Sequence, residues 1–193
     1  MLASRSAFPV ALALVPSLAT ACGPSTPAGP AAGSLFVARG AELGLPEPDP
    51  DWPQGSYSLP EIMQGGVGLF EADGDGDLDL LQVRIPPPGS SPNTITNTLW
   101  RQEADGSFAD VGRAAGLVEA GFGQGLAIGD TDNDGDADVF ITNFGADVFY
   151  TNDGAGRFTN ATAAAGFQDE WWGTSAAFGD VDGDGFLDLY VAN

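Results

Sequence analysis

Carboxylate side chains alternate with other residues in three short segments of this chain. The segment "DTDNDGDAD" (Asp130–Asp138) places five carboxylates within nine residues, and like charges this close repel one another unless something neutralises them. The segments "EADGDGDLD" from Glu71 and "DVDGDGFLD" from Asp180 share its pattern, acid-x-Asp-x-Asp-Gly-x-x-Asp. Fourteen of the 27 Asp and Glu residues lie in these three windows, whereas a merely soluble surface would spread them out.

This spacing suits a bound calcium ion. Calcium takes roughly six to eight oxygen ligands, and a loop with carboxylates at positions 1, 3, 5 and 9 can fold around one ion. The glycine at position 6 permits a sharp backbone turn. We therefore expect about three Ca²⁺ sites, and Glu71, longer than aspartate, is the one departure from the pattern. The predicted ligands are Glu71, Asp73, Asp75 and Asp79, then Asp130, Asp132, Asp134 and Asp138, and finally Asp180, Asp182, Asp184 and Asp188.

Other readings of these loops fit less well. An EF-hand needs Glu at position 12 and helical flanks, but position 12 is Gln82, Ile141 or Val191 and the flanks are strand-like. Magnesium dehydrates reluctantly and seldom sits in an all-protein cage. A stalk of thrombospondin-type calcium repeats would lack the long strand segments found between these loops. A plain Asp/Gly turn could explain one segment, but three in phase favour calcium.

Composition narrows the function classes. The chain carries 6 basic residues, all Arg, and no His, for a net charge of −21, which excludes a basic nucleic-acid surface. Without His or Lys, the usual general base and Schiff-base nucleophile are missing. A carboxylate-only hydrolase or lyase remains open. Its candidate acids outside the loops are Glu61, Asp105, Asp110, Asp147, Asp153, Asp169 and Glu170.

The N-terminus has the pattern of an export signal. Residues 1–21 combine Arg5, an apolar stretch from Phe8 to Leu18 and the small-x-small end "ATA", so we expect a signal peptide. The segment "LATAC" resembles a bacterial lipobox, although Ala19 stands where that pattern favours Leu, so we expect lipidation at Cys22. An ordinary signal peptidase could instead cut the same bond. Residues 22–34 are rich in Gly, Pro and Ala and predict a solvated tether.

The remainder, residues 35–193, contains a second repeat that is in phase with the acidic loops. Runs led by Phe36, Phe108 and Phe158 each have Gly at the ninth place, and the last two precede an acidic loop by the same 22 positions. Each unit shows four short apolar runs separated by turn signals, which predicts four strands in about 50 residues. That is the size of one propeller blade. Small residues before each loop, as in "GLAIG" and "SAAFG", suit a crowded innermost strand.

These motifs resemble a known family. "GDTDNDGDADVFITNFG" and "GDVDGDGFLDLYVAN" are similar to FG-GAP/VCBS repeats, the calcium-bearing blades of extracellular β-propellers such as those of integrin α-subunits. Two further segments, "YSLPEIMQGGVGLFEADGDGDLDLL" and "NTLWR…DGSFADVGRAAGL", resemble sequences of the ASPIC/UnbV group, which is related to cartilage acidic protein. The resemblance implies an all-β propeller of roughly seven four-stranded blades. About two and a half blades would be present, with Phe36 leading a lone outer strand, so the resemblance also implies an incomplete propeller.

The expected function is a non-enzymatic, calcium-binding extracellular module. The chain would be exported, as a periplasmic or outer-membrane lipoprotein of a bacterium or as a secreted protein. Its partner would be an unidentified protein or glycan, with membrane contact only through Cys22. Trp171 and Trp172 would pack between blades or form a ligand platform. Unpaired strand edges predict partial disorder or self-association of the isolated chain, increasing as salt screens its charge.

Overall fold

The computed structural model describes residues 36–46, 65–86, 97–118, 120–167 and 171–193. The chain divides into two units, Met1–Asp49 and Pro50–Asn193. The expected signal peptide, tether and Cys22 lie outside the described residues, as do Glu61, Asp169 and Glu170. Within the described part, no helix is long and apolar enough to span a membrane.

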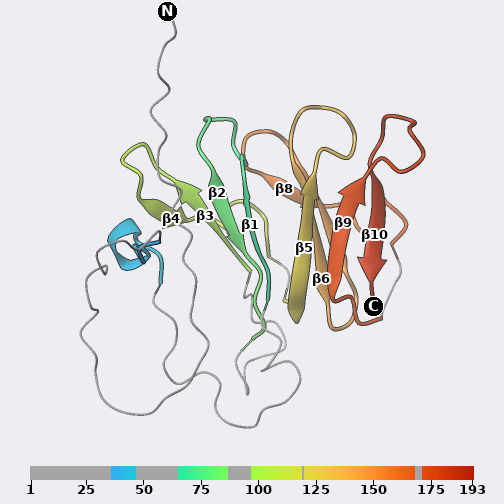
Figure 1. The fold of residues 1–193 in the computed structure, drawn as a ribbon, viewed down its shortest axis with the longest axis horizontal. Coiled ribbons are helices and arrows are strands. Elements are labelled where there is room, and N and C mark those ends of the chain that lie inside the picture. Colours follow the sequence, from blue (N-terminus) through green and yellow to red (C-terminus); the bar gives the residue numbers. More distant parts are fainter. Residues whose placement is uncertain (1–35, 47–64, 87–96, 119, 168–170) are drawn as a thin grey trace, which may run out of the picture. The chain divides into compact units, whose positions relative to one another are not determined.

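The second unit consists of antiparallel sheets whose strands follow chain order (Figure 1). The sheets contain β1 (Val67–Phe70), β2 (Asp79–Gln82), β3 (Thr98–Gln102) and β4 (Phe108–Asp110), then β5 (Gly123–Gly129), β6 (Asp138–Asn143), β7 (Val148–Asn152) and β8 (Phe158–Asn160), and finally β9 (Ser175–Gly179) and β10 (Asp188–Ala192). The first two groups form four-stranded sheets, and the last pair forms a two-stranded sheet. The predicted all-β architecture of four-stranded blades is confirmed.

Two hydrophobic clusters hold neighbouring sheets together. One joins the β1–β4 sheet to the β5–β8 sheet and includes Leu81 and Ile141. The other joins the β5–β8 sheet to β9 and β10 and includes Phe140. The middle sheet is therefore covered on both faces, which explains the continuous apolar run "VFI" in β6, a strand whose residues are all buried.

Close packing between sheets explains the small residues of the first strands. A Cβ atom added to Gly125 in β5 would lie 2.9 Å from the carbonyl oxygen of Thr174, just before β9. One added to Gly129 would lie 2.7 Å from Cδ1 of Leu187. The prediction that small side chains fit a crowded first strand is confirmed at these positions, because the next sheet occupies the space of a larger side chain.

The runs led by phenylalanine end in one repeated turn. In each, the residue at the tenth place donates its N–H to the carbonyl of the fifth, as Leu117 does to Gly112 and Phe167 to Thr162. The ninth residue is a glycine with positive φ, for example 93° at Gly116, so the turn is a Schellman-type end that favours glycine. The segments "GRAAGL" and "TAAAGF" lie in these turns.

The expected lone strand at Phe36 is wrong. In the first unit, residues 36–39 have no regular secondary structure, and η1 (Ala41–Leu43) is a short 3₁₀ helix closed by Gly44 at φ 83°. The run therefore keeps the repeat's turn but not its strand. The physical reason is that a strand needs a hydrogen-bonded neighbour, and within the described residues no strand pairs with this segment.

Candidate metal centres

Each acidic loop connects the first two strands of a sheet. The loops follow β1, β5 and β9, and Figure 1 shows them at the same end of the second unit. The predicted glycine at position 6 has positive φ in every loop, at 93° for Gly76, 98° for Gly135 and 92° for Gly185. The local sequence thus dictates the bend that turns the alternating carboxylates toward one another.

Position 4 also needs the left-handed conformation, which the sequence reasoning missed. Its φ is 79° at Gly74, 62° at Asn133 and 78° at Gly183. Asn133 is the only non-glycine with positive φ among the described residues, and asparagine tolerates this region better than most residues. The signal was present in the sequence, because all three loops carry Gly or Asn at this position.

The acid at position 1 organises the loop interior. One carboxylate oxygen of Glu71 accepts the N–H of Gly74 at 2.9 Å, and the other accepts that of Gly76. Asp130 receives the N–H of Gly135 at 3.0 Å, and Asp180 that of Gly185 at 3.0 Å. The longer Glu71 therefore fills the same place as the two aspartates and is not an outlier in the fold.

The aspartate at position 9 is a buried anchor in the first two loops. Asp79 is 1% exposed, and its two oxygens accept the N–H of Ala72 at 3.1 Å and of Gln102 at 2.8 Å. Asp138 is 2% exposed and accepts N–H groups from Thr131 and Asn152 and the hydroxyl of Thr131. Each carboxylate therefore joins its loop to the third strand of the same sheet, a role that the sequence reasoning did not foresee.

The structure gathers three carboxylates in each loop within 4.8 Å of one another, taking one oxygen from each residue. The groups are Glu71, Asp73 and Asp79, then Asp130, Asp132 and Asp134, and finally Asp180, Asp182 and Asp188. Of the predicted ligands, Asp75, Asp138 and Asp184 are outside these groups. Asp75 and Asp184 each accept the N–H two residues later, as in an Asx turn. The donor set, oxygen only and anionic, fits a hard cation such as calcium.

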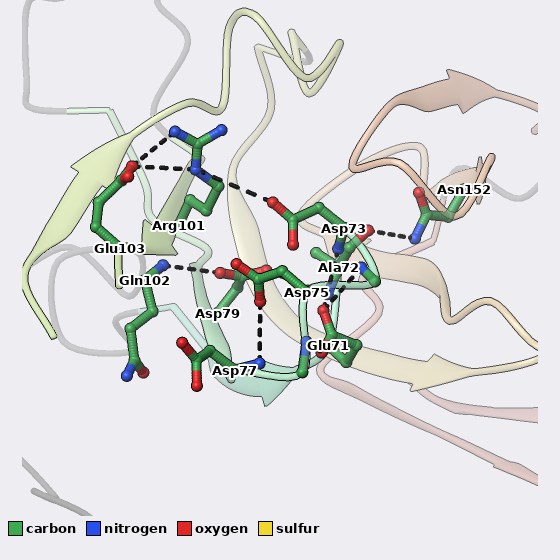
Figure 2. A network of polar contacts seen from close by, with 12 residues as sticks. Glu71, Ala72, Asp73, Asp75, Asp77, Asp79, Arg101, Gln102, Glu103 and Asn152 are labelled. Atoms are coloured by element: carbon green, nitrogen blue, oxygen red, sulfur yellow. Dashed lines mark hydrogen bonds and ion pairs between the residues drawn. The ribbon is translucent and has the colours of Figure 1, made fainter. Parts of the chain in front are cut away.

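The first centre carries features that the others lack in the described structure. Figure 2 shows Arg101 reaching toward Asp73, with Nε 4.0 Å from Oδ2, while its guanidinium also binds Glu103 at 2.6 Å. The other oxygen of Asp73, Oδ1, is buried and accepts no hydrogen bond in the described part of the chain. No sequence pattern predicts Arg101 at this place, because Arg101 lies in β3 and reaches a loop that precedes β2.

Burial and crowding raise carboxyl pKa values at these centres. Burial raises the pKa of Asp79 from 3.8 to about 6, and backbone hydrogen bonds from Gln102 and Ala72 oppose that change. Burial, with Asp75 and Glu71 beside it, raises the pKa of Asp73. In the second loop, partial desolvation of the largely exposed Asp132 and then the charge of Asp134 raise the pKa of Asp132. A bound cation would reverse these directions, because it favours the ionised form.

A cavity of about 290 Å³ adjoins the first centre. Asp73 and Asp79 line it together with Arg101 and with Arg157 from the turn between β7 and β8. The first acidic loop therefore faces the second sheet across this cavity, and its environment depends on both repeats.

Acids outside the loops act as local backbone acceptors. Asp105 accepts the N–H and hydroxyl of Ser107, and Asp110 accepts the N–H of Gly112. Asp153 accepts the N–H of Arg157, and the buried Asp147 accepts that of Asn143 at 2.7 Å. These contacts account for the described candidate acids as turn and strand-end residues.

The two tryptophans differ in environment. Trp172 packs edge-on against Phe144, with ring centroids 5.3 Å apart and a bridge between their backbones. Trp171 is 73% exposed. Of the two expected uses, packing between structural elements describes Trp172.

Comparison with known proteins agrees with the repeat geometry. A search of curated proteins found no match to this chain. A family model described as "FG-GAP-like repeat" matches residues 71–141 and 130–191, and each match runs from one acidic loop through the next. Together the two matches cover more than half of the sequence, and they coincide with the loops and sheets described above. The chain therefore belongs to the FG-GAP-like repeat family.

Proposed function

We propose that this chain is a calcium-stabilised repeat module that serves interaction and not catalysis. One observation carries the proposal: three loops in phase with three sheets each gather three carboxylates within 4.8 Å. Mutual repulsion disfavours such clusters, and a divalent cation removes that cost. Oδ1 of Asp73 adds support, because it is buried without a hydrogen-bond donor among the described residues, and such an oxygen is costly unless something binds it.

The interaction role follows from the family and from the rest of the surface. FG-GAP-like repeats are typically non-enzymatic scaffolds, and the described acids outside the loops serve backbone turns. The proposed partner is an extracellular protein or glycan. With a net charge of −21, nucleic acid is disfavoured. Within the family, the sequence motifs favour the ASPIC/UnbV group, with these sheets as blades of a seven-bladed propeller.

The proposed location is outside the cytoplasm. Residues 1–21 have the charge and apolar pattern of a signal peptide, and Cys22 follows a lipobox-like segment. We propose export with lipid on Cys22, which would be the membrane contact. Mass spectrometry of the mature N-terminus from the native host tests this, since an unmodified Cys22 would reduce the proposal to simple secretion.

Calorimetric titration tests the metal proposal directly. The full chain, freed of metal with a chelator, should take up about three Ca²⁺ ions with Kd near 10⁻⁴–10⁻³ M, the range of extracellular modules. Asp132→Ala and Asp182→Ala should each remove about one site. Millimolar calcium should also raise the melting temperature by mass action. No uptake, together with melting that a chelator leaves unchanged, would reject the proposal.

A further inference from the structure

Asn152, at the end of β7, contacts two acidic loops at once. Its backbone N–H donates to Oδ1 of Asp138 at 2.9 Å, at position 9 of the second loop. Its side-chain Nδ2 donates to the carbonyl oxygen of Ala72 at 2.9 Å, inside the first loop, as Figure 2 shows. Asn152 is 8% exposed, so this contact between repeats is buried.

The hydrogen bonds continue beyond Ala72. The N–H of Ala72 donates to Oδ2 of Asp79 at 3.1 Å. Three hydrogen bonds, connected through the covalent frames of Asn152 and Ala72, therefore link Asp138 to Asp79, which stand at position 9 of the two loops. Every residue on this path is less than 9% exposed. In such a poorly solvated setting hydrogen bonds are stronger than in water.

We propose that Asn152 couples the first and second acidic loops, so that a cation bound at one loop raises the affinity of the other. This inference rests on the proposed calcium binding. Ala72 lies between Glu71 and Asp73. A cation held by their carboxylates would therefore also fix the position of the Ala72 carbonyl, which accepts the hydrogen bond from Asn152. An ordered Asn152 holds Asp138 in place. The second cation then binds a loop that is already ordered, so its binding loses less conformational entropy.

The second and third loops have a different link, which supplies a matched control. Nδ2 of Asn133 donates to the carbonyl oxygen of Gly185 at 2.9 Å, at an exposed position. Water competes with an exposed hydrogen bond, so this link should couple its loops less. Asn133→Gly removes it and keeps the required backbone, because the first and third loops carry glycine at the same position.

The experiment is calcium titration calorimetry of the full chain and its variants at one salt concentration. Asn152→Ala should lose the positive coupling, with a roughly fivefold weaker affinity for the second of the two coupled ions. Asn133→Gly should retain the coupling between the first two loops. Unchanged stepwise affinities in a folded Asn152→Ala chain would overturn the proposal and leave calcium binding intact.

A second set of variants keeps the test independent of Asn152. Asp182→Asn weakens calcium binding at the third loop and leaves the first and second loops unchanged, so calcium uptake should be cooperative. Asp132→Asn weakens the second loop and leaves the first and third, so uptake should be independent. Equal cooperativity in the two chains would overturn the coupling. Absence of calcium uptake by the unmodified chain would overturn both the coupling and the proposed function.

Discussion

Replacing Asp138 with asparagine tests whether position 9 anchors the fold without a cation. Asp138 is 2% exposed and accepts hydrogen bonds from Thr131 and Asn152 at opposite oxygens. Asparagine has the same shape but only one acceptor oxygen, and its amide group is a donor. In Asp138→Asn, the new side-chain NH₂ group therefore faces the N–H of either Thr131 or Asn152, and that buried N–H loses its acceptor.

The expected cost follows from those contacts. An unsatisfied buried donor costs about 1–3 kcal/mol, and hydrogen bonds to a charged group contribute about 1.5–3 kcal/mol each. Removing a buried negative charge beside other carboxylates offsets part of this loss. We expect a net loss of about 2 kcal/mol, which lowers the melting temperature by roughly 4–8 °C for a chain of this size.

The control is Asp132→Asn in the same loop. Asp132 is exposed, and its carboxylate accepts a long hydrogen bond of 3.3 Å from the backbone N–H of Asp134. In chelator this variant should melt within about 2 °C of the unmodified chain, since exposed substitutions usually change stability by no more than about 0.5 kcal/mol. In calcium, both variants should lose part of the stabilisation that the ion supplies.

The assay is thermal unfolding followed by circular dichroism, in chelator and then in millimolar calcium. If Asp138 is a structural anchor, Asp138→Asn melts below Asp132→Asn in chelator. If the two variants melt together without calcium and separate only when it is added, position 9 is a metal ligand and not an anchor. That result would refute the structural role that we assign to Asp138.

Three further predictions follow from the packing and charges. Gly125→Ala should lower stability by about 1–3 kcal/mol in chemical unfolding, because its Cβ meets the Thr174 carbonyl, whereas Gly179→Ala, with open space around it, should be neutral. In chelator, the contribution of Asp79 to the free energy of unfolding should be largest below about pH 4 and be lost as pH rises to about 6. The reason is that the folded chain binds the carboxyl proton of Asp79 more tightly than the unfolded chain does. The unfolding free energy of the unmodified chain minus that of Asp79→Asn should then fall with pH, and a rise would contradict the sign. Self-association measured by light scattering should increase with salt, because screening weakens the repulsion between acidic chains and lets exposed apolar side chains such as Val67 contact other chains. A monomer at every salt concentration would contradict this.

Local sequence determined the repeats, the strands and the loops. The alternation of Asp with Gly specified where each sheet begins its second strand, because a left-handed glycine is needed at position 6 and short apolar runs flank it. The ninth-place glycine specified the Schellman-type turn for the same reason. These features involve residues only a few positions apart, so their spacing can be read along the chain.

Strand formation at Phe36 was not determined locally. The Phe36 and Phe108 runs share their pattern, yet within the described residues only the second forms a strand, which pairs with β3. A strand becomes stable when another strand satisfies its backbone groups, and no local pattern guarantees that neighbour.

Tertiary structure alone decided how the acidic centres differ. The contact of Asn152 with Ala72 joins residues 80 positions apart, and Arg101 approaches Asp73 from another strand. The ligand pattern treats position 9 as one carboxylate among four, but burial against the third strand makes Asp79 and Asp138 hydrogen-bonded anchors. Spacing reports which side chains share a loop, whereas burial and partners arise only when distant strands pack around that loop.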